Sequence, residues 1–110
     1  MKPALFHPKA RAVIKSFPEK VRKEFGKAIL DLQKGHTLGM PLSRPMPAVA
    51  FGVEELRMRD RTGSYRIFYF QKSPRGILIF HAFVKKTQKT SAQEINLGRR
   101  RLKELLDENT

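Results

Sequence analysis

The chain has 110 residues and carries 23 Lys and Arg against 10 Asp and Glu, a net charge of +13 that is spread over both halves. The length favours one domain over residues 1–110, and such a charge attracts polyanions, nucleic acid first among them. The sequence has no cysteine, which excludes disulfides and thiol chemistry, and it has no apolar run of the ~18 residues that a membrane span needs. The start of the chain is also too short and too soon interrupted for a signal peptide, so we expect a cytoplasmic location and no membrane contact.

Two helices are predicted in the first third of the chain. The first spans Pro8 to Ser16, and the motif Ser16-Phe17-Pro18-Glu19 matches a capping box that opens the second, which Gly35 ends. Apolar residues recur along both at helical spacing: Ala10, Val13, Ile14 and Phe17, then Val21, Phe25, Ala28, Ile29 and Leu32. The pattern predicts an N-terminal helical hairpin with a basic outer face.

The segment from His36 to Ala50 lacks periodicity and contains three prolines, which is typical of an irregular connector. We expect it to lie over the sheet or the helices, with its larger apolar side chains in the core: Leu38, Met40, Leu42 and Met46. The alternative is a mobile segment that becomes ordered on binding.

Three strands and one more helix follow. Period-two alternation predicts strands over Val53 to Asp60, Ser64 to Lys72 and Ile77 to Lys85. Ser91-Ala-Gln-Glu94 then repeats the capping pattern and opens a helix whose apolar stripe contains Ile95, Leu102, Leu105 and Leu106, while Gly98 weakens the helix or marks a close contact. The predicted fold class is α+β, with the N-terminal helical hairpin, an antiparallel sheet of three to four strands and a C-terminal helix.

The first two strands bring arginines together. If their hairpin closes on Thr62-Gly63, Arg59 faces Arg66 and Arg57 faces Phe68. Like charges that face each other across strands are destabilising by roughly 0.2 to 1 kcal/mol. The chain therefore has a reason to bind an anion there, and phosphate matches the planar donor fork of arginine.

With simple registers the strands present two distinct faces. The predicted core face contains Leu56, Met58, Tyr65, Ile67, Tyr69, Leu78, Phe80, Ala82 and Val84. The other face contains Arg57, Arg59, Arg66, Phe68, Phe70, Ile79, His81 and Phe83. Its aromatic end either stacks on RNA bases or is covered by a helix, and we favour the covered arrangement because large apolar groups rarely stay exposed. His81 is either a general base or a partly buried structural residue, and its mid-strand position among apolar neighbours favours the second.

Three runs carry a family resemblance: Glu55-Leu-Arg-Met-Arg-Asp60, Gly63-Ser-Tyr-Arg-Ile-Phe-Tyr69 and Phe80-His-Ala-Phe-Val-Lys-Lys-Thr-Gln-Lys-Thr90. With the basic helix that follows, they resemble the RelE/HigB toxins of bacterial type II toxin–antitoxin systems, in particular the phage-derived branch. The likeness extends from about Phe6 to Leu106.

The resemblance implies a RelE-like fold and a ribosome-dependent endoribonuclease that cuts mRNA without a metal or other cofactor and so inhibits translation. It implies a cognate antitoxin as partner, commonly a helix-turn-helix protein through which operator DNA is contacted indirectly. By position, the implied catalytic residues are Arg57, Arg59, Arg66 and Lys86. The other candidates for RNA contacts are Lys85, Lys89, Arg61, Phe68 and His81. RelE-like members often have lysine where this chain has Arg57 and Arg59, so the proton acceptor is left open, because arginine stays protonated.

Two other functions fit the same residues. The chain could be a noncatalytic nucleic-acid-binding module whose cations only hold phosphates, or a degenerate toxin that binds the antitoxin as a corepressor. Loss of cleavage on removal of Arg66 separates the first alternative from the toxin, and growth arrest on expression without a partner separates the second.

Overall fold

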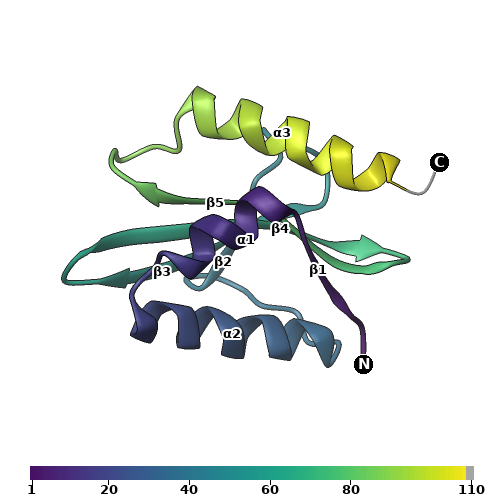
Figure 1. The fold of residues 1–110 in the computed structure, drawn as a ribbon, viewed down its shortest axis with the longest axis horizontal. Helices are drawn as coiled ribbons and strands as arrows, with labels where there is room; N and C mark the ends of the chain where they lie inside the picture. Colours follow the sequence, from purple (N-terminus) through teal and green to yellow (C-terminus); the bar gives the residue numbers. More distant parts are fainter. Residues whose placement is uncertain (109–110) are drawn as a thin grey trace.

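A computed structural model describes residues 1–108 of the chain. Within these residues three helices and a five-stranded sheet form three layers, with the helix α3 (Ala92–Asp107) on one face of the sheet and α2 (Glu19–Gln33) on the other (Figure 1). The helix α1 (Pro8–Lys15) lies against β5. The strand order is β1-β5-β4-β3-β2, with bounds Ala4–Phe6 for β1, Ser43–Pro45 for β2, Val53–Asp60 for β3, Gly63–Ser73 for β4 and Gly76–Lys85 for β5. The predicted α+β class is confirmed.

The three long strands are those that alternation predicts, but the two edge strands are not. β2 pairs antiparallel with β3, whereas β1 pairs parallel with β5, so the sheet is mixed rather than antiparallel. Each of these edge strands has three residues. Such short segments carry no readable alternation, and their strand geometry depends on the long strand beside them.

The first hairpin has a different register from the predicted one. Asp60 pairs with Gly63, so the turn is Arg61-Thr62 rather than Thr62-Gly63. The carboxylate of Asp60 accepts hydrogen bonds from the backbone N–H and the hydroxyl of Thr62, at 2.7 and 2.6 Å, and these bonds lower the pKa of Asp60. Arg57 therefore faces Arg66, and Arg59 faces Ser64. The shift preserves the two faces, because partner numbers change by two and side chains alternate with period two.

The β4–β5 hairpin contains a register shift, and part of the predicted assignment of residues to sheet faces is therefore wrong. Phe68 pairs with His81, but the next residue, Tyr69, pairs with Ile79, so Phe80 is an extra residue in β5. As a result Leu78 and Phe80 point towards α3, and Ile79 points towards α2. The predicted placement of these three residues was wrong, because a bulge reverses the alternation on one side of it.

Each face of the sheet has its own apolar core. Leu56, Ile67, Tyr69 and Ile79 pack with Phe25 and other residues of α2. On the opposite face Phe68, Phe80, Phe83 and Val53 pack with Leu102 and Leu105 of α3. The helix α3 thus covers the aromatic end of this face, which confirms the covered arrangement.

The helices begin close to their predicted positions, with one capping error. Ser91 caps α3 by accepting a hydrogen bond from the backbone N–H of Glu94 at 3.3 Å, as predicted. The predicted capping box of α2 is wrong, because Pro18 is its N-cap and Ser16 donates instead to the carbonyl of Val13.

The connector and the ends of the elements expose several residues that we expected in the core. Met46 is buried and Leu38 and Leu42 are partly so, but Met40 is 64% exposed. Leu106 and Val84 are 48% and 40% exposed. These three exposed residues, Met40, Leu106 and Val84, lie in the connector or near the ends of elements.

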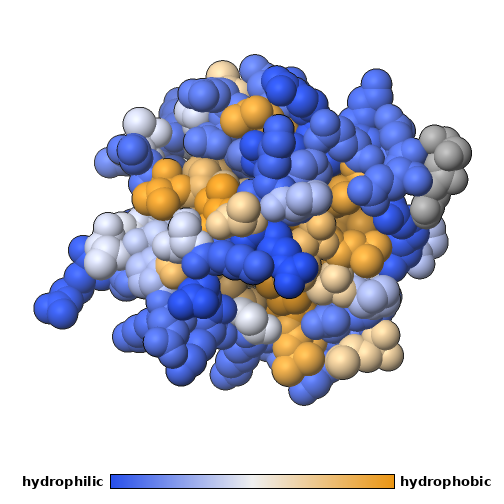
Figure 2. Space-filling model, viewed as in Figure 1, coloured by the Kyte–Doolittle hydropathy of each residue, from blue (hydrophilic) through white to orange (hydrophobic). Residues whose placement is uncertain are grey.

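Hydrophilic side chains cover most of the face drawn in Figure 2, and its apolar patches are separated from one another. No helix within residues 1–108 is long and apolar enough to cross a bilayer.

Candidate functional site

Basic side chains gather on the sheet face that α3 covers. Arg57 and Arg59 come from β3, Arg66 from β4 and Lys85 from β5, at positions that alternation turns to the same side. Arg57 and Arg66 are direct cross-strand partners. Two arginines therefore face each other as predicted, although the partner of Arg66 is Arg57 and not Arg59.

These side chains line an open cleft of ≈ 560 Å³. Its lining consists of Arg57, Arg59, Ser64, Arg66, Lys85, Lys86, Thr87 and Gln88. A second hollow of ≈ 250 Å³ shares its three arginines with the cleft and adds Pro41 and Met58. Neither lining includes an acidic residue. The structure thus brings together all four side chains predicted to be catalytic, Arg57, Arg59, Arg66 and Lys86.

Arg66 is unusually buried for a cation, with only 4% of the residue exposed. Its Nε lies 3.7 Å from a carboxylate oxygen of Glu55 and has no hydrogen-bond partner within residues 1–108, and the buried Nε of Arg57 also lacks one there. Burial lowers the pKa of Arg66, and repulsion from Arg57 lowers it further, while the Glu55 carboxylate opposes the shift. A guanidinium remains charged even so. Two facing guanidinium groups with buried, unbonded Nε atoms are suited to a compact anion with several oxygens.

Glu55 is the residue of this region that sequence reasoning missed. It is fully buried, and one carboxylate oxygen accepts a hydrogen bond from Nε of Arg44 at 3.1 Å while the other accepts one from the hydroxyl of Thr90 at 3.0 Å. The signal that could have found it is its position two residues before Arg57, which puts an acidic residue on the same face of the strand. The expected anion between the arginines is therefore supplied in part by the protein itself. The charge of Glu55 is far from enough to neutralise the cations around it, which are Arg44, Arg57, Arg59, Arg66, Lys85 and Lys86.

The surroundings of Lys85 in the cleft change its titration. Burial lowers its pKa, and repulsion from Arg66 lowers it further, partly opposed by Glu55. An amine with a lowered pKa is more readily found in its neutral form, in which it can accept a proton.

Of the other residues predicted to contact RNA, Lys89 and Arg61 are at the surface, and Phe68 and His81 are buried. Lys89 lines a hollow of ≈ 300 Å³ beside the cleft, which Lys85 and Lys86 also line. Arg61 lies at the exposed turn between β3 and β4 and is not part of either lining.

Phe68 and His81 lie beneath α3, at 0% and 2% exposure. The helix comes this close because Gly98 has no side chain: a Cβ there would be 2.8 Å from a ring carbon of Phe68. Of the two roles considered for Gly98 from the sequence, a weak point in the helix or a close contact, the structure shows the close contact. Direct RNA contact by Phe68 or His81 is therefore not expected, because packing of the helix excludes it.

His81 is held between two charged residues of α3. Arg101 Nη1 lies 2.8 Å from its Nδ1, and Glu94 Oε1 lies 2.7 Å from its Nε2. Because arginine can only donate, Nδ1 must accept, and Nε2 then carries the proton and donates to Glu94. This arrangement fits a neutral imidazole. Burial lowers the pKa of His81, the hydrogen bond from His81 to Glu94 opposes the shift, and Arg101 adds to it.

Acid is therefore expected to destabilise the fold through His81. Its pKa is below 6.5 in the folded state, so the unfolded chain binds more protons as the pH falls through that value, and the free energy of unfolding decreases. Urea unfolding at several pH values from ~7.5 to ~5.5 measures this slope. In His81→Gln, which keeps a neutral donor and acceptor, the slope should be smaller. An equal slope in the two proteins would contradict the assignment.

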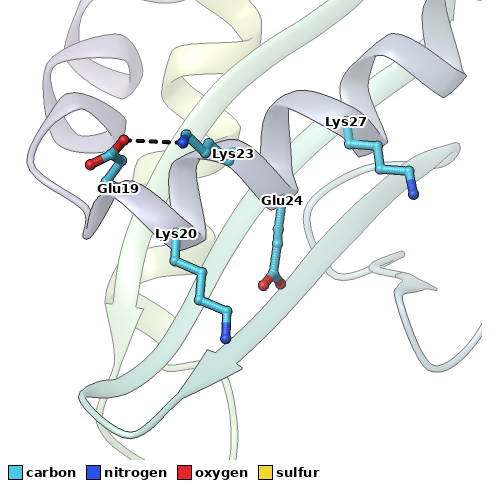
Figure 3. Close-up of a pocket in the computed structure, with 5 residues that line it drawn as sticks. All are labelled: Glu19, Lys20, Lys23, Glu24 and Lys27. Atoms are coloured by element: carbon cyan, nitrogen blue, oxygen red, sulfur yellow. Dashed lines mark ion pairs between the residues drawn. The ribbon is translucent and has the colours of Figure 1, made fainter.

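A further hollow of ≈ 520 Å³ on the outer face of α2 is a weaker candidate site. Its lining mixes acidic and basic side chains of the helix, as Figure 3 shows: Glu19, Lys20, Lys23, Glu24 and Lys27. Lys23 forms an ion pair with Glu19 at 3.2 Å, and both side chains are largely exposed. These charges partly neutralise one another in solvent, so this surface has a weaker attraction for anions than the cleft.

The fold and the cleft define a small α+β protein that presents an open cationic cleft on a β-hairpin, with a C-terminal helix packed on the same face of the sheet. The family described as Phage derived protein Gp49-like (DUF891) matches residues 12–103, and the chain belongs to this family, which is related to RelE-type toxins. The matched region contains every residue of the cleft. No curated protein matches the chain. Within residues 1–108, no group of three His, Asp or Glu side chains is arranged to hold a metal ion.

Proposed function

We propose that the protein is the toxin of a type II toxin–antitoxin pair of RelE/HigB type and that it cleaves mRNA on the ribosome. The observation that carries the proposal is the cleft itself, where Arg57 and Arg66 face each other with buried, unbonded Nε groups. Membership of a toxin-related family supports the same function. An endoribonuclease needs to stabilise negative charge on a phosphate, which is what this cluster of cations supplies.

In the proposed reaction the ribose 2′-oxygen attacks the adjacent phosphorus. The bond between phosphorus and the 5′-oxygen breaks, which leaves a 2′,3′-cyclic phosphate on one fragment and a 5′-hydroxyl on the other. Negative charge builds up on the phosphorus oxygens in the transition state. Arg57 and Arg66 would bind these oxygens, and Arg59 would hold the substrate from the neighbouring position on β3.

The proton transfers are assigned to Lys85, the last residue of β5, and to Lys86, which follows it. Neutral Lys85 would accept the proton of the 2′-hydroxyl, and the ammonium of Lys86 would give a proton to the departing 5′-oxygen. Lys85 suits the first role because its pKa is lowered by burial and by Arg66. The arginines do not suit it because they stay protonated. One proton enters the pair and one leaves it, so the step is balanced.

The partner in this proposal is an antitoxin, which would block the cleft or the surface that meets the ribosome. The net charge of +13 favours an acidic segment of such a partner as well as ribosomal RNA. Operator DNA would be contacted through the antitoxin, and a ribosomal substrate would require a cytoplasmic location.

Purified protein tests the function directly. One mRNA is incubated with the protein either free or on translating ribosomes, and the new ends are mapped by primer extension and tested for a 2′,3′-cyclic phosphate. We expect cuts at a fixed codon position on ribosomes and little cleavage of the free mRNA. Intact mRNA in both reactions, with folded protein that still binds RNA, would instead support a noncatalytic binding module.

A further inference from the structure

Glu55 occupies a central position under the cationic cleft. It lies directly opposite Arg44 of β2 and is the diagonal neighbour of Arg66, which pairs with Arg57 two positions further along β3. Thr90 reaches its carboxylate from the segment between β5 and α3. One buried carboxylate therefore joins three parts of the chain that are far apart in sequence.

Stability alone does not account well for this carboxylate. Burying a charged group carries a large desolvation cost, and a buried ion pair often stabilises a fold no more than apolar residues of the same volume would. Ion pairs and hydrogen bonds do, however, fix the orientation of the groups they join. The segment that Thr90 anchors also contains Lys86, Thr87 and Gln88, which line the cleft.

We infer that Glu55 is a positioning residue: its carboxylate holds the guanidinium of Arg66 and, through Thr90, the segment bearing Lys86, so that both cations meet one phosphate. This inference rests on the proposed function for its effect on cleavage. It assigns to Glu55 no contact with the substrate, because the side chain is fully buried.

Removal of the Glu55 charge should have opposite effects on phosphate binding and on cleavage if Glu55 positions the cations. A carboxylate among the cations repels phosphate, so removal of its charge should leave phosphate binding equal or make it tighter. Loss of orientation should at the same time slow cleavage. A residue that served only to stabilise the fold would leave the cleavage rate per folded molecule unchanged, whatever its charge does to phosphate binding.

Glu55→Gln is the variant of choice because it removes the charge and keeps the shape. We expect single-turnover cleavage on ribosomes to fall by about 10- to 100-fold, while binding of inorganic phosphate, followed by NMR titration, is equal to or tighter than that of the wild type. Glu54→Gln is the matched control. Glu54 is the neighbouring carboxylate on the other face of β3, where it accepts a hydrogen bond from Ser43 at 3.0 Å, and its variant should cleave at nearly the wild-type rate.

A second measurement does not depend on catalysis. The Nε–H signal of Arg66, assigned by its loss in Arg66→Lys, should exchange slowly with solvent in the wild type and shift when inorganic phosphate is added. In Glu55→Gln it should move towards the position of exposed arginines and exchange faster. An unchanged signal overturns the inference, and so does a cleavage rate within about threefold of the wild type, which is too small a loss of transition-state stabilisation for a positioning residue.

The two measurements keep the inference and the proposed function distinguishable. If the wild type does not cleave mRNA, the proposed function fails and the Arg66 signal alone decides the inference. If Glu55→Gln does not fold, Thr90→Val replaces it, since valine has the shape of threonine without its hydroxyl. We expect about 3- to 10-fold slower cleavage with an unchanged Arg66 signal, and wild-type cleavage in this variant overturns the inference.

Discussion

Replacement of Arg66 by alanine is expected to lower the rate of mRNA cleavage by about 100- to 1,000-fold, the usual loss when one preorganised donor to a developing oxyanion is removed. Arg66 is buried at the base of the cleft and faces Arg57, so no other side chain of the lining can take its position. Regulated expression in a bacterial host should then cause no growth arrest, and primer extension should find the messages uncut.

The control for this result is Lys23→Ala, which removes one positive charge from the exposed face of α2 (Figure 3). It should arrest growth and cut mRNA like the wild type. Circular dichroism must show that Arg66→Ala is folded, because its removal leaves Glu55 with Arg44 as its remaining charged partner. If the wild type binds RNA without cutting it, and Arg66→Ala only weakens binding and reduces its salt dependence, the toxin proposal fails and the binding module is favoured.

Replacement of Phe68 by alanine is expected to reduce the free energy of unfolding by about 3 to 5 kcal/mol. Phe68 is fully buried, it contacts the rings of Phe80 and Phe83, and α3 packs directly on it at Gly98. The cavity would open between the sheet and α3, where the surrounding side chains belong to two rigid elements and cannot easily close it. Urea unfolding followed by circular dichroism measures the loss.

Phe51→Ala is the matched control, because it removes the same side chain from a site that is 88% exposed. Its free energy of unfolding should stay within about 0.5 kcal/mol of the wild type. A stable Phe68→Ala protein with impaired RNA binding would contradict the burial of Phe68 and restore the alternative in which its ring stacks on a base.

The three helices, the three long strands and the cationic character of the site are local properties, and the sequence was sufficient for them. Helical spacing identified the three helices, and period-two alternation identified the long strands β3, β4 and β5. The error in the predicted register of the first hairpin did not change which residues share a face of the sheet. The predicted register named Arg59 instead of Arg57 as the partner of Arg66, but a shift of two residues leaves every side chain on the same face.

The sequence alone therefore determined the α+β class and the gathering of arginines on one face of a hairpin, because both follow from residues that are near each other along the chain. Only the tertiary structure decided that Phe80 is an extra residue in β5, that α3 covers Phe68 and His81, and that Glu55 lies among the cations. Thr90 and Arg44, which hold Glu55, are separated from it by 35 and 11 positions. Such contacts depend on how the layers pack, and the alternation of a single strand contains no information about what comes to lie above it.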